Sequence, residues 1–112
     1  MSTPPEKIAH ATVESRLRAL GTGGVGPGLP RRRADRWILL HAAASTLPES
    51  ELPEKELNER LRAWLTGMGP RVTLDHVSLR RALIDEGFVA RDAYGVRYRR
   101  TQAYERRVVF EL

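Results

Sequence analysis

The clearest hydrophobic pattern lies in the second half of the chain and predicts a helix that ends at a glycine. Leu79, Ala82 and Leu83 recur at helical intervals, which places them on one side of an α-helix. Asp75, or Thr73 two residues earlier, can cap the start of this helix, and Gly87 suits the left-handed residue that often closes one. We therefore predict a helix between Asp75 and Gly87.

Two short runs after this helix have the composition of β-strands. Residues 88–91 and 96–99 are rich in β-branched and aromatic side chains, and the second run alternates apolar with charged residues. Between them, Asp92 and Gly95 occupy the first and fourth positions of a turn, as expected for a type I turn that closes an antiparallel hairpin. A helix, a glycine and a hairpin in this order are typical of the second half of a winged helix.

Two helices and a minimal strand are predicted upstream of this unit. The first helix covers residues 31–47 and ends before Pro48, and the second begins at Pro53, whose missing N–H costs little at a helix start. Residues 50–52 leave room only for a short strand, and residues 66–72 contain the glycines and proline of a loop. The apolar stripes are Trp37, Leu40, Ala44 and Leu47 in the first helix, and Leu57, Leu61, Trp64 and Leu65 in the second.

The N-terminal segment is predicted to be an extension of one small domain. Residues 4–20 have the pattern of a short amphipathic helix, and the glycine-rich residues 21–28 have the composition of a linker. A chain of 112 residues, 41% of them hydrophobic, can build one modest core. We expect an α+β winged helix at residues 29–112, with a three-helix core and a C-terminal hairpin wing, preceded by the helical extension and linker at residues 1–28. Residues 103–112 fit either a further strand or a terminal segment packed on the core.

Three blocks of sequence carry a family resemblance. They read E-K-E-L-N at residues 54–58, L-R-R-A-L-I-D-E-G-F-V-A-R at residues 79–91, and G-V-R-Y-R-R at residues 95–100. Together they resemble an uncharacterised bacterial family, the domain of unknown function 2087, over about residues 33–100. The resemblance implies a small protein with a winged-helix-like fold, in a family whose members sometimes follow a DNA-binding regulator domain. It implies no activity, and it identifies no catalytic or binding residues.

The chain departs from the short form of that family in two places. One is the extension at residues 4–28. The other is the loop at residues 66–73, which is longer than the ~3–4 residues typical of a helix-turn-helix. Such a loop changes how the third helix could approach the DNA major groove.

Composition excludes several classes of protein. The chain has no cysteine, so disulfides, thiolate catalysis and cysteine-bearing zinc sites are excluded, and its histidines, His10, His41 and His76, lack ligand spacing. We therefore expect no metal and no cofactor. The sequence offers neither a nucleophile with its base nor a phosphate-binding glycine loop after a strand, so we expect no enzyme. Neither a membrane span nor a signal peptide is found, which predicts a cytoplasmic protein.

Basic residues predict a nucleic-acid-binding surface on the third helix and the hairpin. The chain has 19 lysines and arginines against 14 aspartates and glutamates. On the helix, His76, Arg80 and Arg81 lie away from the apolar arc, and either arginine could contact guanine through two hydrogen bonds. The residues predicted to contact phosphates are Arg71, Thr73, Arg97, Arg99 and Arg100. We therefore predict a small non-enzymatic transcriptional regulator that binds DNA, with RNA as the less favoured alternative.

Several of these residues also have a purely structural interpretation. Arg80 could be held within the domain by Asp75 or Asp85, and the alternation on the hairpin explains its exposed arginines without a ligand. The excess of arginine over lysine is typical of a GC-rich genome. The domain could instead be a protein-interaction module, because the glutamates within residues 49–59 form an acidic face suited to a basic partner. Homodimer formation through the helix at residues 4–20 would be compatible with either function.

Overall fold

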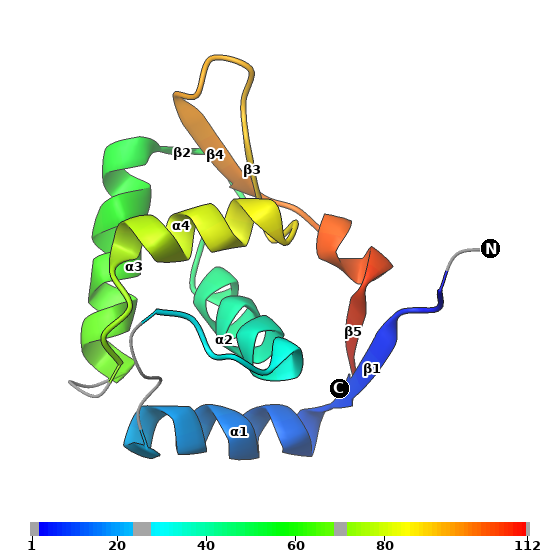
Figure 1. The fold of residues 1–112 in the computed structure, drawn as a ribbon. Helices are drawn as coiled ribbons and strands as arrows, with labels where there is room; N and C mark the ends of the chain where they lie inside the picture. Colours follow the sequence, from blue (N-terminus) through cyan, green and yellow to red (C-terminus); the bar gives the residue numbers. More distant parts are fainter. Residues whose placement is uncertain (1–2, 24–27, 69–71, 112) are drawn as a thin grey trace.

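The computed structural model describes residues 3–23, 28–68 and 72–111 of the chain. Over these residues the protein has a mixed α+β fold with four α-helices, one short 3-10 helix and two small sheets (Figure 1). In chain order the elements are β1 (Glu6–Ala9), α1 (His10–Gly23), α2 (Arg33–Ser45), β2 (Leu52–Pro53), α3 (Glu54–Met68), α4 (His76–Asp85), β3 (Val89–Arg91), β4 (Arg97–Arg100), η1 (Ala103–Arg106) and β5 (Val108–Glu111).

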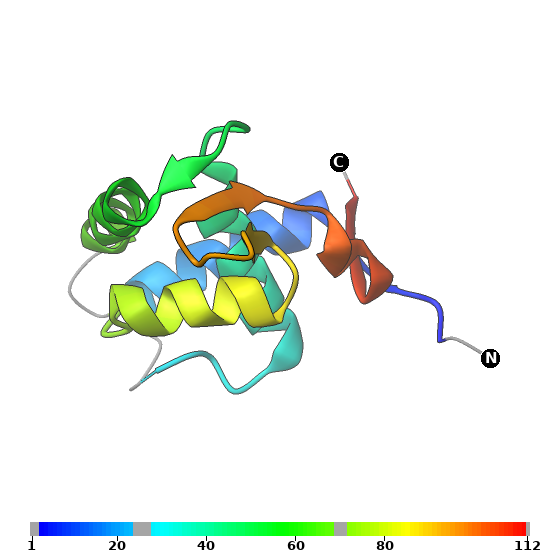
Figure 2. The same ribbon diagram turned by 90° about the horizontal axis from the view of Figure 1, so that it is seen from above.

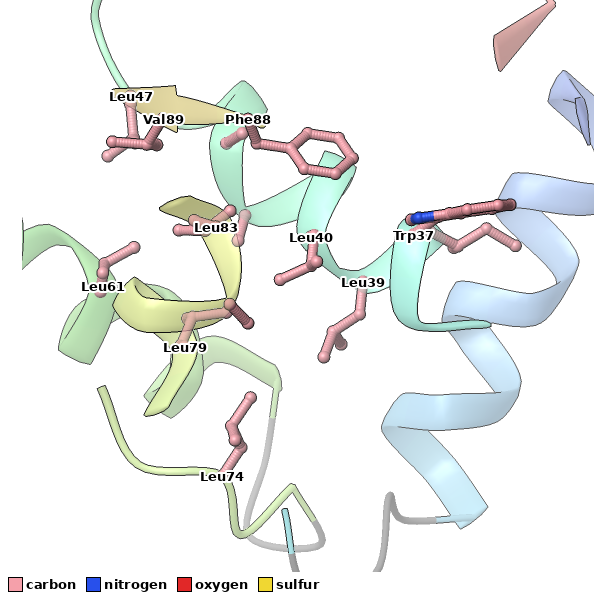
Figure 3. Packing of buried hydrophobic residues seen from close by; sticks show 14 of the residues in the cluster. Trp37, Leu39, Leu40, Leu47, Leu61, Leu74, Leu79, Leu83, Phe88 and Val89 are labelled. Carbon is pink, nitrogen blue, oxygen red and sulfur yellow. The ribbon is translucent and has the colours of Figure 1, made fainter. Parts of the chain in front are cut away.

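Helix α2 occupies the centre of the hydrophobic core. Ile38, Leu39, Leu40 and Ala43 are buried almost completely. Helix α4 lies next to α2 in Figures 1 and 2, and Figure 3 shows Leu40 close to Leu83 of α4. Burying one such side chain stabilises the fold by roughly 1.5–3 kcal/mol. Helices α2 and α3 and strand β2 confirm the two helices and the minimal strand predicted upstream.

The three-stranded sheet has the order β2-β4-β3, with β4 antiparallel to both neighbours. Tyr98 of β4 lies opposite Leu52 of β2 and Arg91 of β3. Because side chains alternate along a strand, Tyr98 points into the core while Arg97 and Arg99 point to the opposite face. The predicted antiparallel hairpin is confirmed.

The turn of this hairpin is organised by Asp92. Its carbonyl oxygen accepts the Gly95 N–H at 3.1 Å, and its carboxylate accepts the Val96 N–H at 2.9 Å. This second hydrogen bond favours the charged carboxylate and lowers the pKa of Asp92 below its ordinary value. Gly95 has a positive φ of 69°, which glycine adopts without steric strain. The aspartate and the glycine therefore have the turn positions that the sequence predicts.

Both ends of α4 have the caps that the sequence predicts. The Asp75 carboxylate accepts the Ser78 N–H at 2.7 Å, and Gly87 has a φ of 85° just after the helix. The Gly87 carbonyl accepts the Tyr104 N–H at 3.1 Å, so this glycine also contacts η1. A Cβ atom at position 87 would lie 2.8 Å from the Tyr104 backbone nitrogen. Any other residue at position 87 is therefore strained for two independent reasons, the backbone conformation and the contact with η1.

We expect Gly87→Ala to destabilise the protein strongly. The left-handed backbone costs an alanine roughly 1–2 kcal/mol, and displacing η1 adds to that cost. Gly67→Ala is the matched control, because it lies within α3 with no atom within 4 Å of the added Cβ, and alanine favours a helix by roughly 0.8–1.0 kcal/mol over glycine. Urea unfolding should show opposite changes in the free energy of unfolding. Equal stability of the two variants would contradict this account.

The N-terminal segment differs from its prediction. Residues 6–9, predicted to be helical, form strand β1, which pairs in parallel with β5 near the C-terminus. In this register Ile8 lies opposite Phe110, and Ile8 is buried in the core. Figures 1 and 2 both show the β1–β5 pair beside the helices, at one side of the molecule. The helix prediction was wrong here because the partner strand lies at the other end of the sequence.

The predicted glycine-rich linker is also shorter than expected. Helix α1 continues to Gly23, so residues 21–23 are helical, whereas residues 24–27 lie outside the described residues. At Gly21 the backbone lies close to Met68, since a Cβ there would be 3.6 Å from the Met68 carbonyl oxygen. Packing between α1 and the end of α3 therefore outweighs the low helix propensity of glycine.

An ion pair between Arg16 and Asp35 joins α1 to α2. The guanidinium donates two hydrogen bonds to the carboxylate, at 3.0 and 2.8 Å. Asp35 is the one buried charged residue in the described part of the chain, with only 6% of its surface exposed. A carboxylate at this depth requires a charged partner. The N-terminal segment therefore packs on the same core as the rest of the described chain, while its separation from the domain at residue 29 stays a prediction.

We expect Arg16→Leu to lower the melting temperature clearly, because it leaves the Asp35 carboxylate buried without its partner. Arg18→Leu is the control, since this neighbour on α1 is exposed. The double variant Arg16→Leu/Asp35→Leu should recover part of the loss, which thermal melts can measure. A single Arg16 variant as stable as the Arg18 variant would contradict the role of the pair.

Candidate nucleic-acid interface

Helix α4 lies beside the base of the β3–β4 hairpin, which projects from the molecule on the side away from α1 (Figure 1). Val77, Ser78, Arg81 and Asp85 form that face, while Leu79 and the other apolar residues of the arc are buried. The 3.6-residue period that predicted the helix therefore also predicts its exposed side correctly.

Arg80 lies at the border of this face and is held within the domain. Its Nη1 donates a hydrogen bond to Asn58 Oδ1 at 2.7 Å and lies 3.4 Å from Glu54 Oε1. The guanidinium also lies over the Tyr98 ring, 6.0 Å from its centroid, and the side chain is only 21% exposed. The carboxylate partners predicted for the structural role were Asp75 or Asp85, whereas the observed contacts are on α3, because α4 packs against that helix.

Tyr98 completes this group, which we call the Arg80 cluster: Glu54, Asn58, Arg80 and Tyr98. The Tyr98 hydroxyl donates a hydrogen bond to Glu54 Oε1 at 2.8 Å. Burial, together with the hydrogen bond to this carboxylate, raises the pKa of Tyr98 above its ordinary value. The cluster thus connects α3, α4 and β4 through polar contacts at the edge of the core.

The Arg80 cluster was missed as a unit by the sequence analysis, although the signal was present. Glu54 and Asn58 begin and end the first of the three blocks that carry the family resemblance. Arg80 lies in the second block and Tyr98 in the third. The three blocks therefore meet in space at these polar contacts.

Three of the arginines predicted to contact nucleic acid are exposed on α4 and the hairpin and have no polar side-chain contact within the described part of the domain. Arg81 lies on α4, and Arg97 and Arg99 share the outer face of β4. None of their three guanidinium groups has a hydrogen bond or ion pair with another residue in the described part of the chain. Their positive charges are therefore available to a ligand.

Arg100 lies on the other side of β4. Its Nη1 donates a hydrogen bond to the Leu47 carbonyl oxygen at 3.3 Å, and its charge contributes to lowering the pKa of His41 on α2. The sequence analysis grouped Arg100 with Arg97 and Arg99. The two-residue period of the strand turns its side chain to the opposite face of β4 from theirs.

The remaining candidates lie at or before the start of α4. His76 lies against Arg62 of α3, with Arg62 Nε 3.4 Å from Nδ1 and Arg62 Nη2 3.3 Å from Nε2. Thr73 is exposed in the segment before α4. Arg71 lies outside the described residues. His76 and Arg81 therefore both belong to α4, whereas the structure does not describe Arg71.

The acidic face predicted for a protein partner is partly engaged within the domain. Glu54 belongs to the Arg80 cluster, and Glu56 forms an ion pair with Arg60 at 3.2 Å. Glu49, Glu51 and Glu59 are exposed. Fewer carboxylates are therefore available to a partner protein than the sequence predicts.

Residues 28–100 match the family DUF2087, described as an uncharacterized protein conserved in bacteria. The chain belongs to this DUF2087 family. The resemblance seen in the sequence is thus confirmed, and the matched segment contains α2, α3, α4 and the whole three-stranded sheet. No curated protein and no solved structure matches the chain.

Two further properties of this DUF2087 member concern the described residues alone. None of their helices combines the length and apolar character needed to cross a bilayer. Among these residues, no group of three or more His, Asp and Glu side chains is placed to hold a metal ion.

We expect Arg80→Met to lower the free energy of unfolding by roughly 1–3 kcal/mol, since it leaves Asn58 and Glu54 without their cationic partner. Arg81→Met is the adjacent control and should change stability by less than about 0.5 kcal/mol. Urea unfolding of the two variants measures the difference. If both variants match the native protein, the Arg80 cluster has no structural role.

Proposed function

We propose that residues 29–100 form a winged helix. The element order α2-β2-α3-α4-β3-β4 and the sheet order β2-β4-β3 support this assignment. In such a fold α4 takes the place of the recognition helix, and the β3–β4 hairpin is the wing. The long connection between α3 and α4 is the main departure from a short helix-turn-helix.

We propose that this DUF2087 member binds duplex DNA without catalysis, as a small transcriptional regulator. The observation that carries this proposal is the exposure of Arg81, Arg97 and Arg99 on α4 and the hairpin. Arginines that are not paired within a protein can replace the counterions of DNA phosphates, which provides most of the affinity at low salt. Arg81 on the helix can also reach a guanine edge through two hydrogen bonds.

The exposed apolar side chains lie on the same two elements. Among the described residues the large exposed hydrophobics are Val77 on α4, and Tyr94 and Val96 near the tip of the hairpin, with Tyr94 89% exposed. Large apolar groups left in water often mark an interaction surface. Val77 suits contact with a thymine methyl group in the major groove.

The roles proposed here differ from those expected from the sequence. Arg80 has a structural role through its cluster, and Arg100 lies on the other face of β4, so neither belongs to the proposed contact set. With three phosphate contacts, affinity should fall with log salt at a slope of about −3. The proposed interface is therefore small, and binding by a single copy should be weak.

Fluorescence anisotropy with a random-sequence duplex at several salt concentrations tests the proposal. The double variant Arg81→Ala/Arg97→Ala should bind more weakly, and its salt slope should be smaller by about 2. The control Arg18→Ala/Arg106→Ala removes the same charge from exposed positions outside α4 and the hairpin, on α1 and η1. It should lose much less affinity.

Two results would contradict the proposal. If the two double variants lose affinity equally, binding follows net charge and not the α4 and hairpin surface. If the native protein does not bind the duplex even at low salt, the DNA proposal fails, and the protein-interaction function replaces it, with Glu49, Glu51 and Glu59 as the acidic contacts to test.

A further inference from the structure

A hollow of about 370 Å³ lies between the second half of α2, the end of β4 and η1. It is lined from α2 by His41 and Ala44, and from the segment after β4 by Thr101, Gln102 and Tyr104. Its volume falls in the range of small-molecule sites, roughly 300–1,000 Å³. Its lining comes from three parts of the sequence, so no single motif predicted it.

The charges around the hollow favour an anion. Arg99 and Arg100 both border it, and within the described residues neither guanidinium has a carboxylate partner. Arg100 is oriented by its hydrogen bond to the Leu47 carbonyl oxygen. Glu49 is the one carboxylate of the lining, so the two cations exceed the single negative charge.

Two aromatic stacks hold the walls in place. Phe88 and Tyr104 are stacked with their ring centroids 4.3 Å apart, and His41 and Phe110 at 4.0 Å. The backbone of Tyr104 is fixed as well, by its hydrogen bond to the Gly87 carbonyl oxygen. Rigid walls reduce the entropy lost on binding, so the site is preorganised for a ligand with an apolar body.

We propose that this hollow binds a small organic anion that carries a carboxylate or phosphate group. Arg99 and Arg100 would hold the oxyanion, because guanidinium groups form strong charge-assisted hydrogen bonds with both kinds of group. The Gln102 amide and the Thr101 hydroxyl are additional donors at the same rim. The ring of Tyr104 would contact the apolar body of the ligand.

His41 provides a reporter of binding at this place. Burial, and then the charge of Arg100, lower its pKa below the ordinary value. The charged and titratable groups that border the hollow beside it are Arg99, Arg100, Glu49 and Tyr104. An anion placed between the arginines offsets their charge, so occupation of the hollow should raise the pKa of His41.

The experiment uses the full chain and phenyl phosphate, benzoate and inorganic phosphate as probes, with neutral benzamide as a control. NMR titrations at constant ionic strength should show saturable shifts at Gln102 and Tyr104, and a higher pKa for His41 in the presence of the bound probe. The two aromatic anions distinguish a phosphate from a carboxylate ligand. Both should bind more tightly than inorganic phosphate, because only they fill the apolar part of the hollow.

Variants that remove either a positive or a negative charge distinguish binding at this site from a general effect of net charge. Arg99→Gln and Arg100→Gln should each weaken binding of the preferred aromatic anion by about tenfold or more, whereas Glu49→Gln should strengthen it by removing a like charge. Arg106→Gln, at an exposed position on η1 that does not border the hollow, should leave affinity unchanged. Because Arg100 also contacts the Leu47 carbonyl, the Arg99 and Glu49 variants keep the test valid if the Arg100 variant is unstable.

Three outcomes would overturn the proposal. Shifts that do not saturate, or that are equal in every variant, would indicate an adventitious ion only. Benzamide binding as tightly as benzoate would remove the role of the arginines. Inorganic phosphate binding as tightly as phenyl phosphate would show that the apolar body of the ligand contributes nothing to binding.

Discussion

The position of Tyr98 is the constraint that joins the hairpin to the helices. It lies in the central strand of the three-stranded sheet, with 2% of its surface exposed. Its hydroxyl reaches Glu54 at the start of α3, and Arg80 of α4 lies over its ring. A buried phenol needs a hydrogen-bond partner, and a half-buried guanidinium needs acceptors. The contacts among Tyr98, Glu54 and Arg80 therefore lower the free-energy cost of burying these polar groups. The hairpin and the two helices are therefore held in one arrangement by a small polar cluster.

The same strand decides which charges can act together. Because Tyr98 faces inward, Arg97 and Arg99 must face outward, and Arg100 must return to the inner side, next to α2. One strand thus contributes arginines to both of its faces. Arg99 and Arg100 nevertheless both border the hollow beside His41. A charge count along the sequence cannot show which arginines share a site.

Features that depend on near neighbours could be predicted from the sequence. The Asp75 cap, the Gly87 stop and the Asp92 turn each involve residues within a few positions of one another, and each is present. Strand β1 is different, because its four residues bury only Ile8 and pair with a strand at the opposite end of the chain. The partners of Arg80 likewise depend on how α4 packs against α3. Periodicity places a residue on a face of its element, but it does not identify the element that this face meets.

The contacts of the Arg80 cluster give a structural reason for the three sequence blocks that carry the family resemblance. Glu54, Asn58, Arg80 and Tyr98 are distributed over all three blocks, and they contact one another. The resemblance is thus explained in part by the need to hold the hairpin on the helices. Arg81 and Arg99 lie within the same blocks as neighbours of the cluster residues, but they are exposed. The contacts of Arg80 and Tyr98 within the cluster fix the backbone of the exposed arginines beside them. A ligand that binds these arginines would therefore meet a rigid interface.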